Sequence, residues 1–511
     1  MKALKKIFVI CLVTGAFVSC KKQLLDINVD PNNPTTASAS PDLVLSNALN
    51  TTAAIYDNST AGNNNFVWAG LWLGHISYSG NFAIATENIS YNLTNTFAQG
   101  TWDNLYDNIE DYDFVEKKGI QTGNSFYKAI GMFMKAYNYQ TLVDLYNNVP
   151  YSEALQGTAN SRPKYDDGKT IYADLAKKMD TAIALFKIIA IGGSPSISGD
   201  IMFNKKNTAT VAATMAEATL WTQFANTVKL RLLLRQSEKN GAAAQAQAAA
   251  ISGGYLTTDA TVNPGYLNSS GKSNPFWGQN YNVSRTYTQT LYRGGAFAIQ
   301  FLKNNGDTFR LRKFYTPVGG VADTSLSKYA GNYFGDQGVP NSATSQIGSG
   351  VLKNYDQDAV VMLAAESYFL QSEAVLRSWI NVPGETAQTL YEKGVTASFN
   401  FLGLSAAQAQ TYFTQPNNKN TSWGSTTGFQ EQLALIIRQK WIAETWVNEM
   451  EPYNDYRRLH LPADIPLSTS PFSTGIFPNR LMYPQREISV NGENVAAQGN
   501  VTPGSKVWWM P

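Results

Sequence analysis

Cysteine and histidine are almost absent from this 511-residue chain. The two cysteines, Cys11 and Cys20, lie close to the start, so the body of the protein has no disulfide, no thiol nucleophile and no thiolate metal site. The two histidines, His75 and His460, offer little material for a catalytic triad or a zinc site. A Gly-x-Ser-x-Gly elbow and a phosphate-binding glycine loop are also missing. The sequence therefore predicts no catalytic residues, no metal site and no cofactor.

The apolar run near the N-terminus is too short to span a membrane. Ile7–Phe17 covers about 11 residues, whereas a bilayer needs ~20. Three lysines precede this run, and the small residue Ser19 precedes Cys20. This pattern indicates a removable export signal, and a cysteine at the cut is typical of a bacterial lipoprotein whose new first residue carries acyl chains. An ordinary secretory peptide cut near Ser19 is the alternative.

Charge is scarce, at 15% of residues against the ~25% of a typical soluble domain. Lys and Arg number 40 and Asp and Glu 38, and removal of three lysines with the signal leaves 37 − 38 = −1. Such a balance favours neither nucleic acid nor an anionic membrane surface as a partner. Aromatic residues reach 12% and asparagine is abundant, a composition that suits neutral polar ligands such as sugars.

Helical periodicity is the strongest structural signal. The run from Phe126 to Tyr146 is apolar on nearly all sides, which predicts a buried helix ending before Pro150. Further helices are expected at 171–186, 221–235, 359–379, 386–402 and 430–450, the last ending at Pro452. Between them lie long Gly, Asn, Ser and Pro-rich stretches, at 58–100, 252–290, 315–355 and 463–500. We expect a mostly α fold of paired helices with long irregular insertions.

Two acids on one expected helical face, Glu366 and Glu373, are the best candidates for a glycosidase pair. We interpret them as structural residues that pair with arginines between helices. In the same way, Arg457–Arg458 are expected to brace the C-terminal helix, with Glu444 or Glu451 as partners.

A first aromatic segment with the character of a ligand platform runs from 65 to 78. Trp68, Trp72 and His75 recur at helical spacing, and Tyr78 ends the segment. Aromatic rings can stack on the apolar faces of sugars. The alternative is that this stripe is core, as aromatic stripes usually are.

Loops provide two further candidates. Trp277 and Tyr281, followed by Arg285, lie in an Asn- and Gly-rich loop, where helix packing gives no reason for aromatic residues and binding residues concentrate. The alternative is that this loop folds its rings back over the helices as cover. Tyr333, beside Phe334 in a Gly-flanked loop, is the third candidate.

Several blocks resemble the SusD/RagB-type outer-membrane lipoproteins. They include LLDINVDPNNPTTAS after Cys20, MKAYNYQTLVDLYNNVPYSEAL (134–155), WTQFANTVKLRLLLR (221–235), DAVVMLAAESYFLQSEAVLRSW (358–379), RQKWIAETWVNEMEPYNDYRRLHLP (438–462) and NRLMYPQREISVNGENV (479–495). The blocks occur in the expected order over nearly the whole mature chain. The Gln-Lys-Trp helix in the fifth block is similar to one subgroup of this family.

This resemblance implies tetratricopeptide-like helix pairs, a lipid anchor at Cys20 in the outer membrane, and a TonB-dependent barrel transporter as partner. Members capture glycans, or in some cases peptides, and deliver them without cleavage. We expect residues 1–19 to be the signal peptide, 20–40 the lipidated tether and 41–511 one helical-repeat domain. Lys21–Lys22 stand where surface-exported lipoproteins of this type often carry acidic residues. The sequence therefore supports attachment to the outer membrane more strongly than exposure on its outer surface. Glycan binding is the first hypothesis, peptide capture the second and glycan hydrolysis the third.

Overall fold

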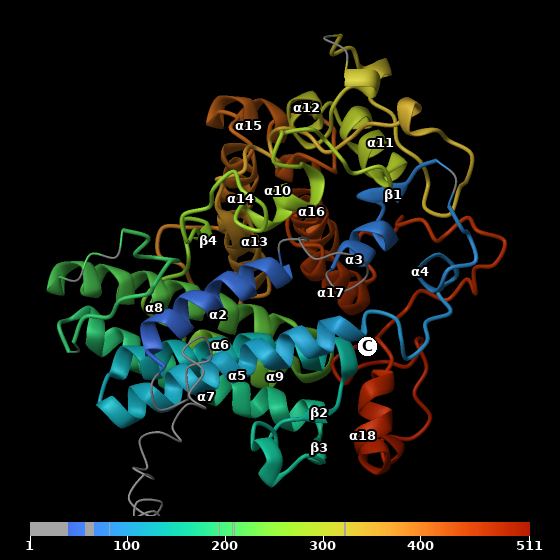
Figure 1. Cartoon of the computed structure of the whole chain (residues 1–511). Coiled ribbons are helices and arrows are strands. Elements are labelled where there is room, and N and C mark those ends of the chain that lie inside the picture. Colours follow the sequence, from blue (N-terminus) through green and yellow to red (C-terminus); the bar gives the residue numbers. More distant parts are fainter. Residues whose placement is uncertain are drawn as a thin grey trace, which may run out of the picture.

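The computed structural model describes residues 39–56, 66–80, 82–193, 195–206, 208, 210–320 and 323–511, and it is mostly helical, as expected (Figure 1). The helices are α2 Pro41–Tyr56, α3 Val67–Trp72, α4 Glu87–Ser90, α5 Gln99–Thr122, α6 Ser125–Tyr146, α7 Gly168–Ala190, α8 Val211–Leu234, α9 Ser237–Ala249, α10 Pro275–Asn280, α11 Ala296–Asn304, α12 Thr308–Phe314, α13 Ala364–Leu376, α14 Ala387–Phe401, α15 Ala406–Phe413, α16 Gly428–Ala443, α17 Met450–Leu459 and α18 Gln485–Ala496. Short strands pair antiparallel as β1 Ile76–Tyr78 with β5 Tyr292–Gly294, β2 Val149–Pro150 with β3 Tyr165–Asp166, and β4 Ala260–Val262 with β6 Ala359–Met362.

Helices α5 to α8 pack as successive neighbours and form the lower part of the molecule in Figure 1. The turn between α5 and α6 follows from its sequence. Gly123 ends α5 with φ of 69°, and the Asn124 side chain accepts hydrogen bonds from the backbone N–H groups of Phe126 and Tyr127 at 3.0 and 3.2 Å. Helix α6 is buried along most of its length and ends at Tyr146, which confirms the prediction for 126–146.

Three predicted helices have wrong boundaries. The helix expected at 221–235 is α8, which already begins at Val211. The segment 359–379 begins as strand β6, because its valines pair with β4, and becomes helical only at Ala364. The helix expected at 430–450 ends at Ala443 as α16, and a turn with Trp446 in a left-handed conformation (φ of 65°) separates it from α17, which begins at Met450. Pro452 lies in the first turn of α17 and does not end a helix. Proline is tolerated there because the N–H groups of a first turn have no acceptor within the helix.

Short elements occupy the long insertions, among them α3, β1 and α4 in 58–100 and β4 and α10 in 252–290. One buried core includes residues from Leu45 near the start to Met510 near the end. Across the described part of the chain, the helices are too short or too polar to span a bilayer.

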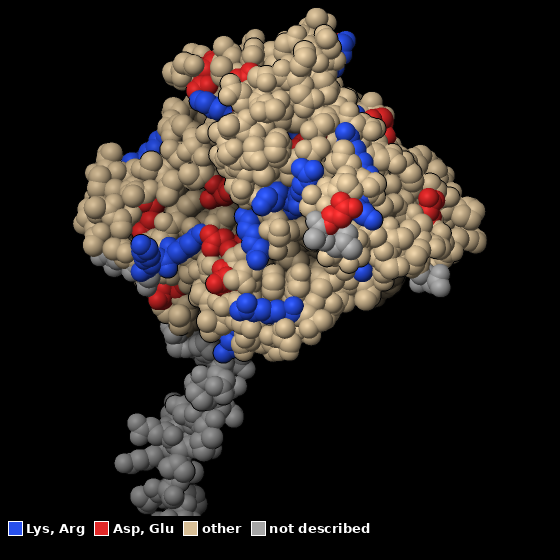
Figure 2. Space-filling model, turned by 90° about the horizontal axis from the view of Figure 1, so that it is seen from above, with Lys and Arg blue, Asp and Glu red and all other residues tan. Residues whose placement is uncertain are grey.

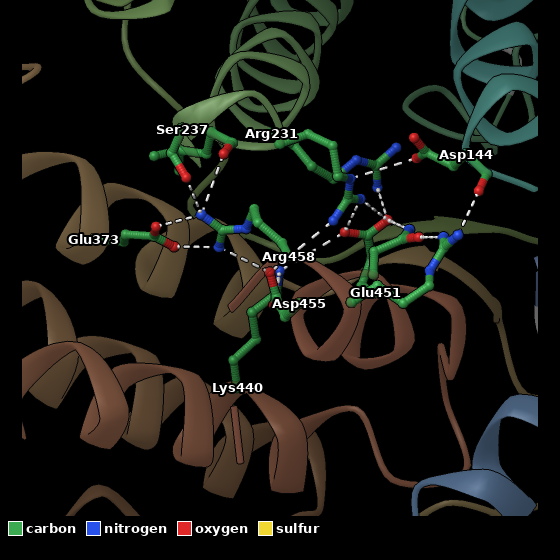
Figure 3. Close-up of polar contacts among 12 residues, drawn as sticks. Asp144, Arg231, Ser237, Glu373, Lys440, Glu451, Asp455 and Arg458 are labelled. Atoms are coloured by element: carbon green, nitrogen blue, oxygen red, sulfur yellow. Dashed lines mark hydrogen bonds and ion pairs between the residues drawn. The ribbon is translucent and has the colours of Figure 1, made fainter. Parts of the chain in front are cut away.

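A buried network of charges joins five helices (Figure 3). Arg458 of α17 forms a two-point ion pair with Glu373 of α13, with N–O distances of 2.6 and 2.7 Å. Arg235 of α8 reaches Glu451 of α17 at 2.8 Å and Asp144 of α6 at 3.4 Å. Lys440 of α16 pairs with Asp455 of α17 at 3.0 Å and so joins α16 to the network. All of these side chains are at most 5% exposed.

Within this network Glu366 and Glu373 pair with arginines from other helices, which confirms their structural interpretation. Glu366 lies 3.5 Å from Arg231 of α8. The prediction for Arg457–Arg458 is wrong in its partners: Arg458 pairs with Glu373 and Asp455, and Arg457 donates to the backbone carbonyls of Asp144 and Asn479. Both arginines nevertheless fix α17 against its neighbours.

Glu373→Gln should destabilise the fold by about 3 kcal/mol at pH 7, because Arg458 loses its strongest partner while it stays buried. Burial alone would raise the pKa of Glu373, but the charges and hydrogen bonds of Arg458 and Arg377 lower it from 4.5 to about 2. The carboxylate therefore stabilises the fold above about pH 4.5, and that contribution is lost as the pH falls towards 2. Denaturant unfolding of the wild-type protein and of Glu373→Gln from pH 7 to 3 measures their free energies of unfolding. The difference between the two free energies should shrink below pH 4.5.

The pair of Lys419 and Glu431 at the surface provides the control, since Lys419 is 63% exposed, solvent screens the pair and Lys419→Gln should change stability little. If the difference in unfolding free energy between the wild type and Glu373→Gln does not change with pH, the low pKa assigned to Glu373 is contradicted.

Candidate ligand-binding site

The first predicted platform lies inside the protein. Trp68 and Trp72 are 0% exposed; their rings lie 4.5 Å apart, and Trp68 meets Tyr453 of α17 edge-on at 5.2 Å. Helix α3 ends at Trp72, so His75 leaves the helical face, pairs with Glu449 at 2.5 Å and packs on the Trp441 ring. The core interpretation holds for these three residues, because no face of their rings is open to a ligand in this structure.

The second predicted platform is largely closed by its own rings. Trp277 and Tyr281 stack face to face with centroids 4.1 Å apart and planes 11° apart, and Tyr287 meets Tyr281 edge-on. Trp277 is 8% exposed as a result. Arg285 is exposed and lies over the Tyr355 ring at 4.9 Å. Trp277 and Tyr281 therefore cover each other, Tyr281 is half-buried, and Arg285 lies apart from both, over Tyr355.

A pocket of about 520 Å³ opens beside Tyr78, and we call it the Tyr78 pocket. Its lining residues are Tyr78, Phe82, Ala83, Thr86, Glu87, Asn88, Ile89 and Leu291. The pairing of β1 with β5 sets Tyr78 opposite Tyr292, with ring centroids 5.7 Å apart, and Phe82 lies 5.2 Å from Tyr78. The pocket therefore combines two aromatic rings, Tyr78 and Phe82, with polar residues in and just before α4.

The Tyr333 segment lies beside this pocket. The Asn332 side chain donates to the Tyr78 carbonyl at 3.2 Å, and Phe334 packs 6.1 Å from the Tyr78 ring. Tyr333 itself is half-buried, and its hydroxyl donates to Gln300 at 2.8 Å. The structure thus brings together the segments of two predicted residues, Tyr78 and Tyr333, and leaves Trp277, Tyr281 and Arg285 in a separate cluster.

Asn88 is the most buried polar group of the Tyr78 pocket, at 2% exposed. Its Nδ2 donates to the Tyr78 hydroxyl at 2.7 Å, and its backbone carbonyl accepts from the indole N–H of Trp72 at 3.1 Å. Its Oδ1 has no hydrogen-bond partner in the protein. Burial raises the pKa of Tyr78 well above 10, so the phenol stays protonated and neutral.

Sequence reasoning missed Phe82, Asn88, Leu291 and Tyr292. Phe82 and Asn88 stand in the same Asn-rich stretch as Tyr78, and a search for polar side chains next to aromatic ones could have found them. No local signal identifies Tyr292, because only the β1–β5 pairing brings it to Tyr78.

The chemistry available in the Tyr78 pocket is binding through ring faces and neutral hydrogen bonds. Of the described residues that line it, Glu87 alone carries a carboxylate, which accepts a hydrogen bond from the Thr94 backbone N–H at 3.0 Å. Among the described residues, no group of three or more His, Cys, Asp or Glu side chains could hold a metal ion. Such a pocket suits a neutral ligand with both apolar and hydrogen-bonding groups.

Comparison with known structures shows the same fold in SusD-like proteins. A SusD-like protein from Bacteroides thetaiotaomicron superimposes with a TM-score of 0.73 at 22% identity, over 91% of this chain and 98% of that one. A chitin-binding SusD homologue from Flavobacterium johnsoniae gives 0.74 at 23% identity, over 91% and 98%. A SusD homologue from Bacteroides fragilis gives 0.69 at 22% identity, over 92% and 99%.

No curated protein matches the chain in sequence. The model of one protein family does match, over residues 31–484, and its description is "Starch-binding associating with outer membrane". This match spans most of the chain, and the helical fold agrees with it. The chain therefore belongs to the SusD-like family.

Proposed function

We propose that this protein is a lipid-anchored, outer-membrane capture protein that binds a neutral glycan in the Tyr78 pocket without cleaving it. The carrying observation is the pocket itself, where the half-buried Phe82 offers an aromatic ring and Thr86 and Glu87 offer polar groups. Sugars present apolar C–H faces and hydroxyl groups, and these two kinds of surface match the two kinds of lining.

The surface charge supports a neutral ligand. The face in Figure 2 carries few charged side chains, and blue and red groups are interleaved on it. The names of the relatives point the same way, since one structural neighbour is a chitin-binding protein and the family is described as starch-binding. We infer that the captured glycan passes to a TonB-dependent barrel transporter, with the chain held on the exterior by acylated Cys20.

Phe82→Ala should weaken glycan binding about ten-fold, or ~1.4 kcal/mol, because it removes a half-buried ring from the pocket wall. A glycan and peptide array would first identify the ligand of the mature protein, and calorimetry would then compare the variants. Phe429→Ala is the matched control, since this partly exposed ring of α16 lies against Arg377 and outside the pocket.

Tyr281→Ala tests the other aromatic cluster in the same experiment. If Tyr281→Ala loses affinity for the glycan and Phe82→Ala does not, the glycan binds at the cluster of Trp277, Tyr281 and Tyr287 instead. Binding of peptides alone would overturn the glycan proposal, and release of reducing sugar by the purified protein would overturn binding without cleavage.

Cys20→Ala should release the protein from membranes, because the acyl chains have no other attachment point. Fractionation of cells that express the full chain would measure this. Cys11→Ala is the control, since the only other cysteine lies within the signal and its loss should leave attachment intact. Persistent attachment of Cys20→Ala would refute the anchor.

A further inference from the structure

A second pocket, of about 560 Å³, lies between α8 and α13, and we call it the Gln371 pocket. Helix α8 contributes Gln223 to its lining, and α13 contributes Tyr368 and Gln371. Two segments outside the helices, 251–255 and 380–383, form much of the remaining wall. The Gln371 pocket and the Tyr78 pocket have no lining residue in common.

Backbone groups without hydrogen bonds border the pocket on the segment 251–255. The Asn226 side chain donates to the carbonyls of Ser252 and Gly254 at 2.9 and 2.7 Å and so holds this segment on α8. Gly253 and Gly254 have φ of 99° and 79°, a conformation that favours glycine. Within the described part of the chain, the N–H groups of Gly253, Gly254 and Tyr255 find no acceptor.

The segment 380–383 has the same property. The N–H groups of Asn381 and Val382 carry no hydrogen bond to any described residue. Two backbone segments with free donors therefore border one pocket.

Side-chain amides add further hydrogen-bonding groups. Gln371 is 4% exposed, and its Nε2 donates to the carbonyl and the hydroxyl of Ser367 at 3.2 and 3.1 Å. This orients the amide and leaves Oε1 as a free acceptor. The Gln223 amide lies beside the first segment, since a Cβ added at Gly254 would be 3.8 Å from its Nε2. Burial raises the pKa of Tyr368, so its phenol is a neutral donor.

The apolar part of the wall is aliphatic and branched rather than flat. Its members are Ile251, Ile380, Val382, Pro383 and Leu390. Such a surface fits an aliphatic side chain, whereas a sugar stacks on the flat face of an aromatic ring. The charged residues of the described lining, Lys393 and Glu385, pair with each other. Neither is left for a charged group of a ligand.

We propose that the Gln371 pocket binds an extended, uncharged segment of a partner protein and takes up one aliphatic side chain of that segment. Carbonyls of the segment accept from the free N–H groups of 253–255 and 381–382, and one of its N–H groups donates to Gln371 Oε1. Main-chain hydrogen bonds and a side-chain pocket are the usual elements of peptide recognition. A short free peptide brings charged ends that find no partner here, so an internal segment fits better. This inference goes beyond the proposed glycan binding and does not depend on it.

Pentapeptides of the sequence Ser-Thr-Leu-Thr-Ser, acetylated and amidated at their ends, are the probe. Calorimetry on the mature protein should show them binding at least about ten-fold tighter than the same peptides with aspartate in place of leucine. Peptides with free, charged ends should bind more weakly than the capped ones. Equal affinity for the leucine and aspartate peptides, or no binding of either, would overturn the proposal. Tighter binding of the uncapped peptides would overturn the assignment to an internal segment.

Val382→Asp places a carboxylate beside the aliphatic wall and should weaken binding of the capped leucine peptide about ten-fold or more. Val283→Asp is the matched control, since Val283 is an exposed loop valine outside both pockets. Gln223→Ala removes a half-buried amide and should also lower the affinity, which provides a second variant should Val382→Asp not fold. Circular dichroism and thermal unfolding establish that each variant is folded. Unchanged affinity in a folded Val382→Asp variant would contradict the site.

The glycan and peptide sites are tested separately in the same proteins. Phe82→Ala should leave peptide binding unchanged, and a glycan bound in the Tyr78 pocket should not displace the peptide. Loss of peptide binding in Phe82→Ala but not in Val382→Asp would overturn the inference and assign the peptide to the Tyr78 pocket. Loss of glycan binding in Val382→Asp would likewise overturn the inference, because the glycan would then occupy the Gln371 pocket.

Discussion

The placement of α17 is the constraint on which the candidate site depends. One face of this helix carries Glu451, Asp455 and Arg458 into the buried charge network, and another carries Tyr453 against Trp68 of α3. Helix α3 leads directly into β1, which ends at Tyr78. The ion pairs among α8, α13 and α17 therefore fix, through α3, the strand that builds one wall of the pocket.

A second link runs through Glu449, just before α17. Its carboxylate accepts from the Trp446 backbone at 2.8 Å and pairs with His75 at 2.5 Å, so one side chain joins the start of α17 to the residue that precedes β1. Buried ion pairs repay their desolvation cost only when their geometry is good and both partners stay in place. We infer that the network contributes more to the unique arrangement of these helices than to net stability, in a body that has no disulfides to fix it.

Sequence reasoning succeeded where the structure depends on local pattern. The run from Phe126 to Tyr146 is apolar on nearly all sides, and it forms helix α6, which packs between α5 and α7. Sequence reasoning failed where the conformation of a segment depends on another part of the chain. The strand of β6 depends on β4, and the position of Pro452 depends on a left-handed Trp446 that no propensity predicts. The spacing of Trp68 and Trp72 correctly indicated a helix. Their burial could not be predicted from it, because Tyr453, far away in the sequence, packs against both rings.

Aromatic abundance favours a class of ligand and does not locate a ligand site. A ring stacks on a sugar only with a face that no other ring already covers, and most rings here are covered. Trp277 faces Tyr281, Trp72 faces Phe97, and both arrangements are stacked. What distinguishes the Tyr78 pocket is that two of its rings, Tyr78 and Phe82, border an open volume of about 520 Å³. An open volume beside aromatic rings is thus a stronger indication of a binding site than aromatic residues in a loop, because packing explains the loop rings and leaves the volume unfilled.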